Sequence, residues 1–213
     1  LHRRQRRGGH HRGRDQRRGR RSETGLGLAS WLDPALLPPF DPATRVHPPL
    51  RSDEDSEALI EGLRDGTIDA IVSGHMPRSV IEKDCEYRVA EPGISAFETA
   101  LGLALTLVHR GKIDLVDLVA KLNEGPAKVL GRSPATLQPG HFADIVIFDP
   151  EAKWTVDPAH FLSKSHSNPV AGQQLRGRVQ MTMFRGEIVF RRDGFGESAH
   201  SPNASRIEGI LEE

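Results

Sequence analysis

The chain has 213 residues, among them 29 Lys and Arg, 29 Asp and Glu, and a single cysteine. This length can bury a sizeable core in one or two domains. The single cysteine, Cys85, excludes an internal disulfide and favours a reducing compartment such as the cytoplasm. No apolar run reaches the length of a membrane span, so we expect no membrane partner.

Positive charge is concentrated at the start of the chain. Residues 1–21 carry ten Arg and three His against one Asp, which leaves the rest with 19 basic and 28 acidic residues and a net charge of −9. Residues 1–31 show no helical or strand period, and we expect a disordered or non-native basic segment. Two alternatives stay open. The segment can be the translation of a shifted reading frame or, less favoured, an arm that binds the phosphates of nucleic acid.

Residues 32–131 alternate between helix and strand after a proline-rich turn region. Ser52 and Asp55 form a capping-box pattern that predicts a helix, and Gly66 predicts its end. Residues 68–73, rich in β-branched side chains, predict a buried strand after a very short loop. A helix followed directly by a buried strand is typical of α/β folds built from βαβ units.

The loop after this strand, residues 74–94, is the first candidate for a functional site. It begins with Gly74, His75 and Arg78, and the carboxyl ends of strands are where α/β enzymes place their chemistry. Long loops in compact domains are also often functional. Because no second ligand is nearby, we expect His75 to be structural, whereas Arg78 can either bind a carboxylate or lie in solvent.

Three further helices are predicted before the pattern changes. Ser95 and Glu98 form a second capping-box pattern, which predicts a long helix that ends at Gly111. Residues 114–122 and 125–130 predict two shorter helices.

From residue 132 to residue 190 the apolar period becomes that of strands, and we expect a small β module beside the α/β part. The predicted strands are residues 143–149, 154–156, 177–184 and 187–190, the last two joined in a hairpin by Arg185-Gly186. Residues 191–213 are expected to be a loose tail.

Several short blocks stand in a fixed order between about residue 32 and residue 190. They are His47-Pro48-Pro49-Leu50-Arg51, Asp65-Gly66-Thr67-Ile68-Asp69-Ala70-Ile71, Gly74-His75-Met76-Pro77-Arg78, Glu82-Lys83-Asp84-Cys85, Pro92-Gly93-Ile94, Phe97-Glu98-Thr99-Ala100, Leu137-Gln138-Pro139-Gly140, Ala143-Asp144-Ile145-Val146-Ile147, Phe161-Leu162-Ser163-Lys164-Ser165 and Asn168-Pro169. In order and spacing these blocks resemble the dihydroorotases of the amidohydrolase superfamily.

The resemblance implies an α/β fold. Residues 32–131 would be the last strands and helices of an incomplete (β/α)8 barrel, and residues 132–190 part of an accessory β-sandwich. The implied reaction is reversible hydrolysis of dihydroorotate to N-carbamoyl-aspartate in de novo pyrimidine synthesis. In the family, zinc activates the water and an aspartate acts as general base.

The resemblance also marks the site residues and the departures from the family. Gly74 stands where the family has the aspartate that binds metal and accepts the proton, so no catalytic or metal-binding residue is intact and we expect no bound zinc. Arg78 replaces a substrate-binding histidine and His47 a substrate-binding asparagine. Pro92 and Gly93 match a loop whose backbone contacts the substrate ring. Without the resemblance, His47 reads as a packing or surface residue.

Two functions fit these observations. The first is a dihydroorotase-type enzyme by descent, with this chain a truncated and inactive copy. The second is a non-catalytic scaffold partner of aspartate carbamoyltransferase, a role of family relatives that have lost metal ligands. Since a few barrel strands alone would expose strand edges and apolar helix faces, we expect the isolated chain to associate or to be poorly soluble.

Overall fold

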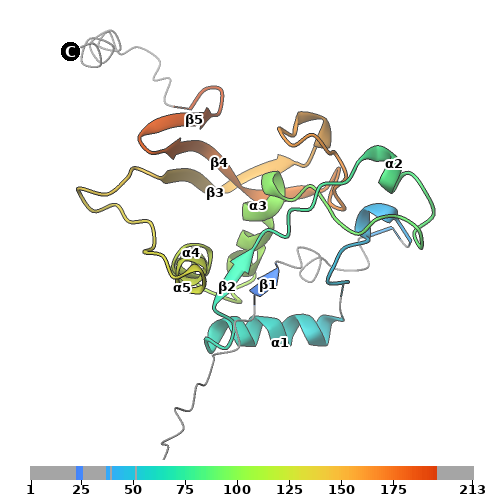
Figure 1. The fold of residues 1–213 in the computed structure, drawn as a ribbon, viewed down its shortest axis with the longest axis horizontal. Coiled ribbons are helices and arrows are strands. Elements are labelled where there is room, and N and C mark those ends of the chain that lie inside the picture. The colour runs from blue at the N-terminus through green and yellow to red at the C-terminus, as the bar shows by residue number, and fades with distance from the viewer. Residues whose placement is uncertain (1–22, 26–36, 39, 51, 196–213) are drawn as a thin grey trace, which may run out of the picture.

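A computed structural model of the protein describes residues 23–25, 37–38, 40–50 and 52–195 (Figure 1). The elements, with η for 3-10 helices, are β1 (Glu23–Gly25), η2 (Pro42–Thr44), α1 (Asp53–Arg64), β2 (Ala70–Val72), α2 (Val80–Lys83), α3 (Phe97–His109), α4 (Leu115–Leu122), α5 (Glu124–Leu130), β3 (Ile145–Thr155), η3 (Pro158–His160), β4 (Gln174–Phe184) and β5 (Glu187–Arg191). Most of the expected basic segment, Arg51 and residues 196–213 of the expected tail lie outside the described residues.

The predicted step from helix to strand is present in α1 and β2. Ser52 Oγ accepts a hydrogen bond from the backbone N–H of Asp55 at 3.3 Å, as the capping pattern predicts. The helix buries Ile60 and Leu63. The strand covers only Ala70–Val72, which is shorter than predicted.

The sequence did not predict the strand that pairs with β2. Glu23–Gly25 forms β1, which pairs with β2 in parallel and places Thr24 opposite Ile71. The expectation that residues 1–31 contain no strand is therefore wrong for these three residues. A strand of this length is too short to display a period of two, and its pairing satisfies backbone groups of the buried strand beside it.

Helix α3 lies at the centre of the fold. Figure 1 shows it between the β1–β2 pair and the sheet formed by β3, β4 and β5. Leu103, Leu105 and Leu107 of this helix are buried almost completely. One hydrophobic core includes Ile71 of β2 as well as Leu175 of β4, so the α/β part and the β module share a core.

The C-terminal strands form one antiparallel sheet in the order β3–β4–β5. The prediction of two separate strands at residues 143–149 and 154–156 is wrong, because β3 runs through both. A register shift between Asp149 and Lys153 interrupts the regular ladder and accommodates Pro150, which has no N–H to donate. The predicted hairpin is confirmed: Arg185 and Gly186 have φ angles of 52° and 91°, as a two-residue turn between twisted strands requires.

Residues 191 and 192, which the sequence assigns to the tail, belong to the sheet or are bonded to it. The backbone N–H of Arg192 donates to the carbonyl of Gln180 at 2.8 Å, and its Nε donates to the carbonyl of Val179 at 2.9 Å. These two bonds tie Arg192 to β4.

Gly125, at the start of α5, packs directly against the residue before β2. A Cβ atom on Gly125 would collide with the backbone carbonyl oxygen of Asp69 and would lie 3.1 Å from Ala70 Cα. The helix can therefore lie against the strand only because this position has no side chain.

We expect Gly125→Ala to lower the free energy of unfolding by about 1–3 kcal/mol, because the clash with fixed backbone outweighs the gain in helix propensity. Urea unfolding followed by circular dichroism measures this. The control is Gly62→Ala in α1, whose added Cβ would meet side-chain atoms of Ile68, Cδ1 at 2.9 Å and Cγ1 at 3.1 Å, with no backbone atom among its nearest neighbours. Equal stability of the two variants would contradict the proposed packing.

The described surface retains many exposed apolar side chains. Among the described helices, none combines the length and the apolar character of a membrane span. The exposed set includes Leu115, Val116, Val119 and Leu122 on α4, Val146 and Ile147 on β3, and Ile188 and Val189 on β5. Within the described residues, β3 and β5 each leave one edge of the sheet without a partner strand.

We expect the purified chain to associate, because apolar faces and open strand edges favour contacts between copies. Light scattering after gel filtration should give a mass above that of one chain. Val189→Lys should reduce association more than Val80→Lys, which changes an exposed valine on α2 away from the sheet. A monodisperse monomer would contradict this expectation.

Candidate functional site

The carboxyl end of β2 is where the sequence places the site, and Gly74 occupies it in a left-handed conformation. Its φ angle is 64°, a region that residues with a Cβ rarely adopt. The residue is exposed and offers no side-chain ligand. The chain then continues beside the end of the loop: His75 forms an isolated parallel bridge with Ile94, and the Met76 N–H donates to the Ile94 carbonyl at 2.9 Å.

His75 binds the start of α3. Its Nδ1 atom accepts hydrogen bonds from the backbone N–H groups of Ala96, at 3.1 Å, and Phe97, at 3.3 Å. Its ring stacks on the Phe97 ring with centroids 3.7 Å apart. Nδ1 can accept only when it carries no proton, so the proton of the neutral ring is on Nε2. His75 therefore acts as a helix cap, in line with its expected structural role.

Three of the four predicted substrate-binding residues lie together. Arg78 Nε donates to the carbonyl of Pro92 at 2.9 Å, and Nη1 lies 3.4 Å from Glu82 Oε1. A Cβ on Gly93, whose φ is 142°, would lie 3.2 Å from Arg78 Nε and would collide with the Met76 carbonyl oxygen. The glycine is thus required by packing. Arg78 is half-buried and fixes the loop rather than lying free in solvent.

Arg78 sits beside a short helix whose cap was not predicted. Ser79 and Glu82 form a complete capping box at the start of α2. The hydrogen bonds from Ser79 are the main reason that the pKa of Glu82 is lowered, with the nearby Arg78 adding to the effect. The Ser-x-x-Glu spacing was present in the sequence and could have identified this helix.

His47, the fourth predicted residue, is exposed in the segment before α1. This segment is joined to the loop through Arg45, whose carbonyl accepts from the Gly93 N–H at 3.0 Å. Arg45 Nη1 also donates to the carbonyls of Tyr87, at 2.7 Å, and Arg88. The structure gives His47 no contact that identifies a function.

The residues at the end of β2 do not fit a zinc ion. Zinc sites in proteins use three or four Cys, His or carboxylate ligands. Gly74 supplies no ligand atom, and the Nδ1 atom of His75 is already occupied by α3. Nowhere among the described residues do three or more His, Cys, Asp or Glu side chains gather to hold a metal ion.

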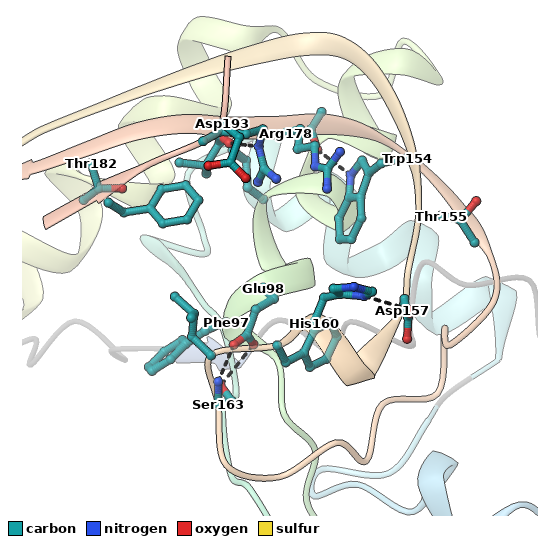
Figure 2. Close-up of a pocket in the computed structure, with 18 of the residues that line it drawn as sticks. Phe97, Glu98, Trp154, Thr155, Asp157, His160, Ser163, Arg178, Thr182 and Asp193 are labelled. Atoms are coloured by element: carbon teal, nitrogen blue, oxygen red, sulfur yellow. Dashed lines mark hydrogen bonds and ion pairs between the residues drawn. The ribbon is translucent and has the colours of Figure 1, made fainter. Parts of the chain in front are cut away.

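A large hollow of about 890 Å³ lies between α3 and the sheet (Figure 2). His75 and residues of α3 line one part of it, and residues of β3, β4, β5, the segment 157–163 and residues 192–193 line the rest. Sequence reasoning missed this hollow, because its walls come from segments that only the packing of α3 against the sheet brings together.

Glu98 lines one side of this hollow, and its hydrogen bonds differ from the predicted capping box with Ser95. Its two carboxylate oxygens accept hydrogen bonds from Ser163, one from the backbone N–H at 2.8 Å and one from Oγ at 3.0 Å (Figure 2). The predicted capping box with Ser95 is therefore wrong. α3 begins one residue later, after Ala96, and Ser95 Oγ instead donates to the Ser165 carbonyl at 2.5 Å.

The opposite side of the hollow is basic and aromatic. Arg178 lies over the ring of Trp154, 5.4 Å from its centroid, and Figure 2 shows the two side chains next to each other. Trp154 Nε1 donates to the Gly177 carbonyl at 2.9 Å. Burial, together with the charge of Arg178, lowers the pKa of Arg192. No motif in the sequence pointed to these residues.

Comparison with known proteins gives a family match and relatives that are longer than this chain. The model of the amidohydrolase family matches residues 42–189. A dihydroorotase from Syntrophus aciditrophicus is 47% identical over 154 residues, which are 72% of this chain and 36% of the relative. One from Thermoanaerobacter sp. is 45% identical over 155 residues, with the same coverage of 72% and 36%. The chain thus spans about a third of the length of these relatives, and the predicted resemblance to dihydroorotases is confirmed.

Solved structures give the same fold. The L-hydantoinase (dihydropyrimidinase) from Arthrobacter aurescens superposes with a TM-score of 0.72 and 32% identity, over 80% of this chain and 39% of that chain. A D-hydantoinase superposes with a TM-score of 0.63 over 71% of this chain and 34% of that one, at 24% identity. Together with the family match, these neighbours imply a fold of the TIM-barrel type.

We expect His75→Ala to lower the free energy of unfolding by about 1–2 kcal/mol, because the first N–H groups of α3 lose their acceptor. Urea unfolding measures the change. The matched control is His160→Ala, which removes an exposed histidine whose ion-pair partner among the described residues is Asp157, and should change stability little. If both variants are equally stable, His75 does not cap the helix.

Proposed function

The chain belongs to the amidohydrolase family, and we propose that it is a portion of a dihydroorotase-type cyclic amidohydrolase. The reaction of the whole enzyme would be hydrolysis of dihydroorotate to N-carbamoyl-aspartate in pyrimidine synthesis, in the cytoplasm. Residues 32–131 would form the last part of the (β/α)8 barrel, and residues 132–190 part of the accessory sandwich. The dihydroorotase relatives and the hydantoinase neighbour support this reaction class.

We propose further that the chain itself does not catalyse the reaction, and Gly74 is the observation that carries this proposal. By resemblance, its position belongs to the aspartate that binds the metal and accepts the proton. A glycine can do neither, and its exposed, left-handed backbone is a conformation that strains most side chains. The neighbouring His75 offers only Nε2 to a ligand, because Nδ1 caps α3.

The proposed substrate contacts are Arg78, Pro92, Gly93 and His47. Arg78 replaces the family's histidine. Among the described residues, Nη1 donates to Glu82 and Nη2 to Met76, so each of these two atoms keeps a second N–H group for a carboxylate. The Pro92 carbonyl already accepts from Arg78, so substrate binding through this loop would fall to the remaining backbone groups.

A scaffold function is the second candidate. The loop and the start of α3 are held by the cap from His75 and by the bonds between Glu98 and Ser163, while position 74 has no carboxylate. A chain with this fold and without catalytic activity suits the role of a non-catalytic partner of aspartate carbamoyltransferase.

We expect the purified chain, assayed with added zinc, to show no hydrolysis of dihydroorotate above the uncatalysed rate. Gly74→Asp alone should not restore activity, because a zinc site needs further ligands that the described residues do not supply. Turnover that depends on zinc in the unmodified chain would contradict the proposed loss of catalysis.

Two observations separate the candidates. Genomic DNA upstream that encodes, in any reading frame, the missing barrel strands with their metal ligands would favour a damaged or split enzyme. Co-purification with aspartate carbamoyltransferase, lost when the exposed faces of β3 and β5 are made charged, would favour the scaffold.

A further inference from the structure

The hollow between α3 and the sheet has the size of a small-molecule site. Its volume of about 890 Å³ lies within the range of ligand sites in proteins. Figure 2 shows Arg178 and Trp154 on the side of the sheet, and Phe97 and Glu98 on the side of α3. None of the four residues proposed above as substrate contacts lines this hollow. It is therefore a separate place on the molecule from the loop after β2.

Two partly buried arginines, Arg178 and Arg192, line the same side of this hollow. Burial and the charge of Arg178 lower the pKa of Arg192, so the two guanidinium groups are close enough to repel each other. The Nε of Arg192 donates to the carbonyl of Val179 at 2.9 Å. The two Nη groups of Arg192 and the whole guanidinium of Arg178 have no hydrogen-bond acceptor and no ion-pair partner among the described residues. Two like charges with free donors on one wall favour an anion.

The carboxylates that line the hollow leave the sheet side positive. Glu98, on the side of α3, accepts both of its hydrogen bonds from Ser163. Asp157 pairs with His160 at 2.9 Å. Asp193 lies on the side of the sheet, and its charge offsets part of the charge of the neighbouring arginine, because it acts to raise that pKa. On this side two guanidinium groups therefore stand against a single carboxylate.

Aromatic rings stand next to both guanidinium groups. The Cζ of Arg178 lies 5.4 Å from the centroid of the Trp154 ring, and the Cζ of Arg192 lies 5.5 Å from that of the Phe190 ring. The Trp154 ring is fixed in the wall, because its Nε1 donates to a backbone carbonyl of β4 at 2.9 Å. Across the hollow, Phe97 is 64% exposed. Aromatic rings and guanidinium planes are the side-chain groups on which a planar ligand stacks.

We propose that this hollow binds a small aromatic anion, a planar ring that carries a carboxylate or a phosphate group. The anionic group would accept hydrogen bonds from Arg178 and from the Nη groups of Arg192, since a guanidinium suits both kinds of oxyanion. The ring would lie against the aromatic and apolar side chains of the walls. This binding goes beyond the proposed function and does not depend on it, because the two sites share no proposed contact residue.

Titration calorimetry of the full chain with benzoate and with adenosine monophosphate tests the proposal, since both carry a planar ring but differ in the anionic group. Their neutral counterparts, benzamide and adenosine, should bind roughly tenfold more weakly, because they lack the charge-assisted hydrogen bonds. Binding of benzoate alone assigns a carboxylate ligand, and binding of the nucleotide alone assigns a phosphate ligand. Binding of neither anion at millimolar concentration, or equal binding of the neutral counterparts, would overturn the proposal.

Variants of three kinds locate the binding. Arg178→Met removes a guanidinium whose direct contact among the described residues is the Trp154 ring, so the chain should fold and should bind the anion roughly tenfold more weakly. Arg178→Lys keeps the charge without the planar fork and should bind with intermediate affinity. The matched control, Arg191→Met, removes an exposed arginine that does not line the hollow and should leave the affinity unchanged. Unchanged binding in Arg178→Met, or an equal loss in Arg191→Met, would show that the anion does not bind in this hollow.

Discussion

The start of α3 is the constraint on which the rest of the structure depends. Ala96, at the helix cap, has no side-chain acceptor, so the first N–H groups bond to His75 Nδ1. Asn168 Nδ2 donates to the Ser95 carbonyl at 2.7 Å and to Thr99 Oγ1 at 3.0 Å. One helix end thereby joins the end of β2 to the segment before β4. The bonds of Asn168 are buried, where such bonds are strongest.

The loop after β2 is held in place without any contribution from the side chain at position 74. The bonds that hold the loop after β2 come from His75, from Arg78 and from backbone groups, and none of them involves position 74. A glycine at this position therefore leaves the support for the loop unchanged, which agrees with the proposed loss of catalysis in a chain that keeps its fold. The conformation of Gly74 even relieves the strain that a side chain would meet.

The hollow of Figure 2 depends on the same helix end. Glu98 of α3 accepts two hydrogen bonds from Ser163, and both residues line the hollow. Its walls combine aromatic and apolar side chains with charged ones, among them Arg178 and Arg192.

The sequence by itself determined the family, the helix that begins at Ser52, and the hairpin at Arg185-Gly186, because these rest on local patterns and on blocks in fixed order. It also determined that Gly74 carries no ligand. Only the tertiary structure decided that His75 caps α3, that Glu98 bonds to Ser163 instead of Ser95, and that Glu23–Gly25 pairs with β2. Each of these contacts joins residues far apart in the chain, and their partners are chosen by packing around α3, which no local pattern records.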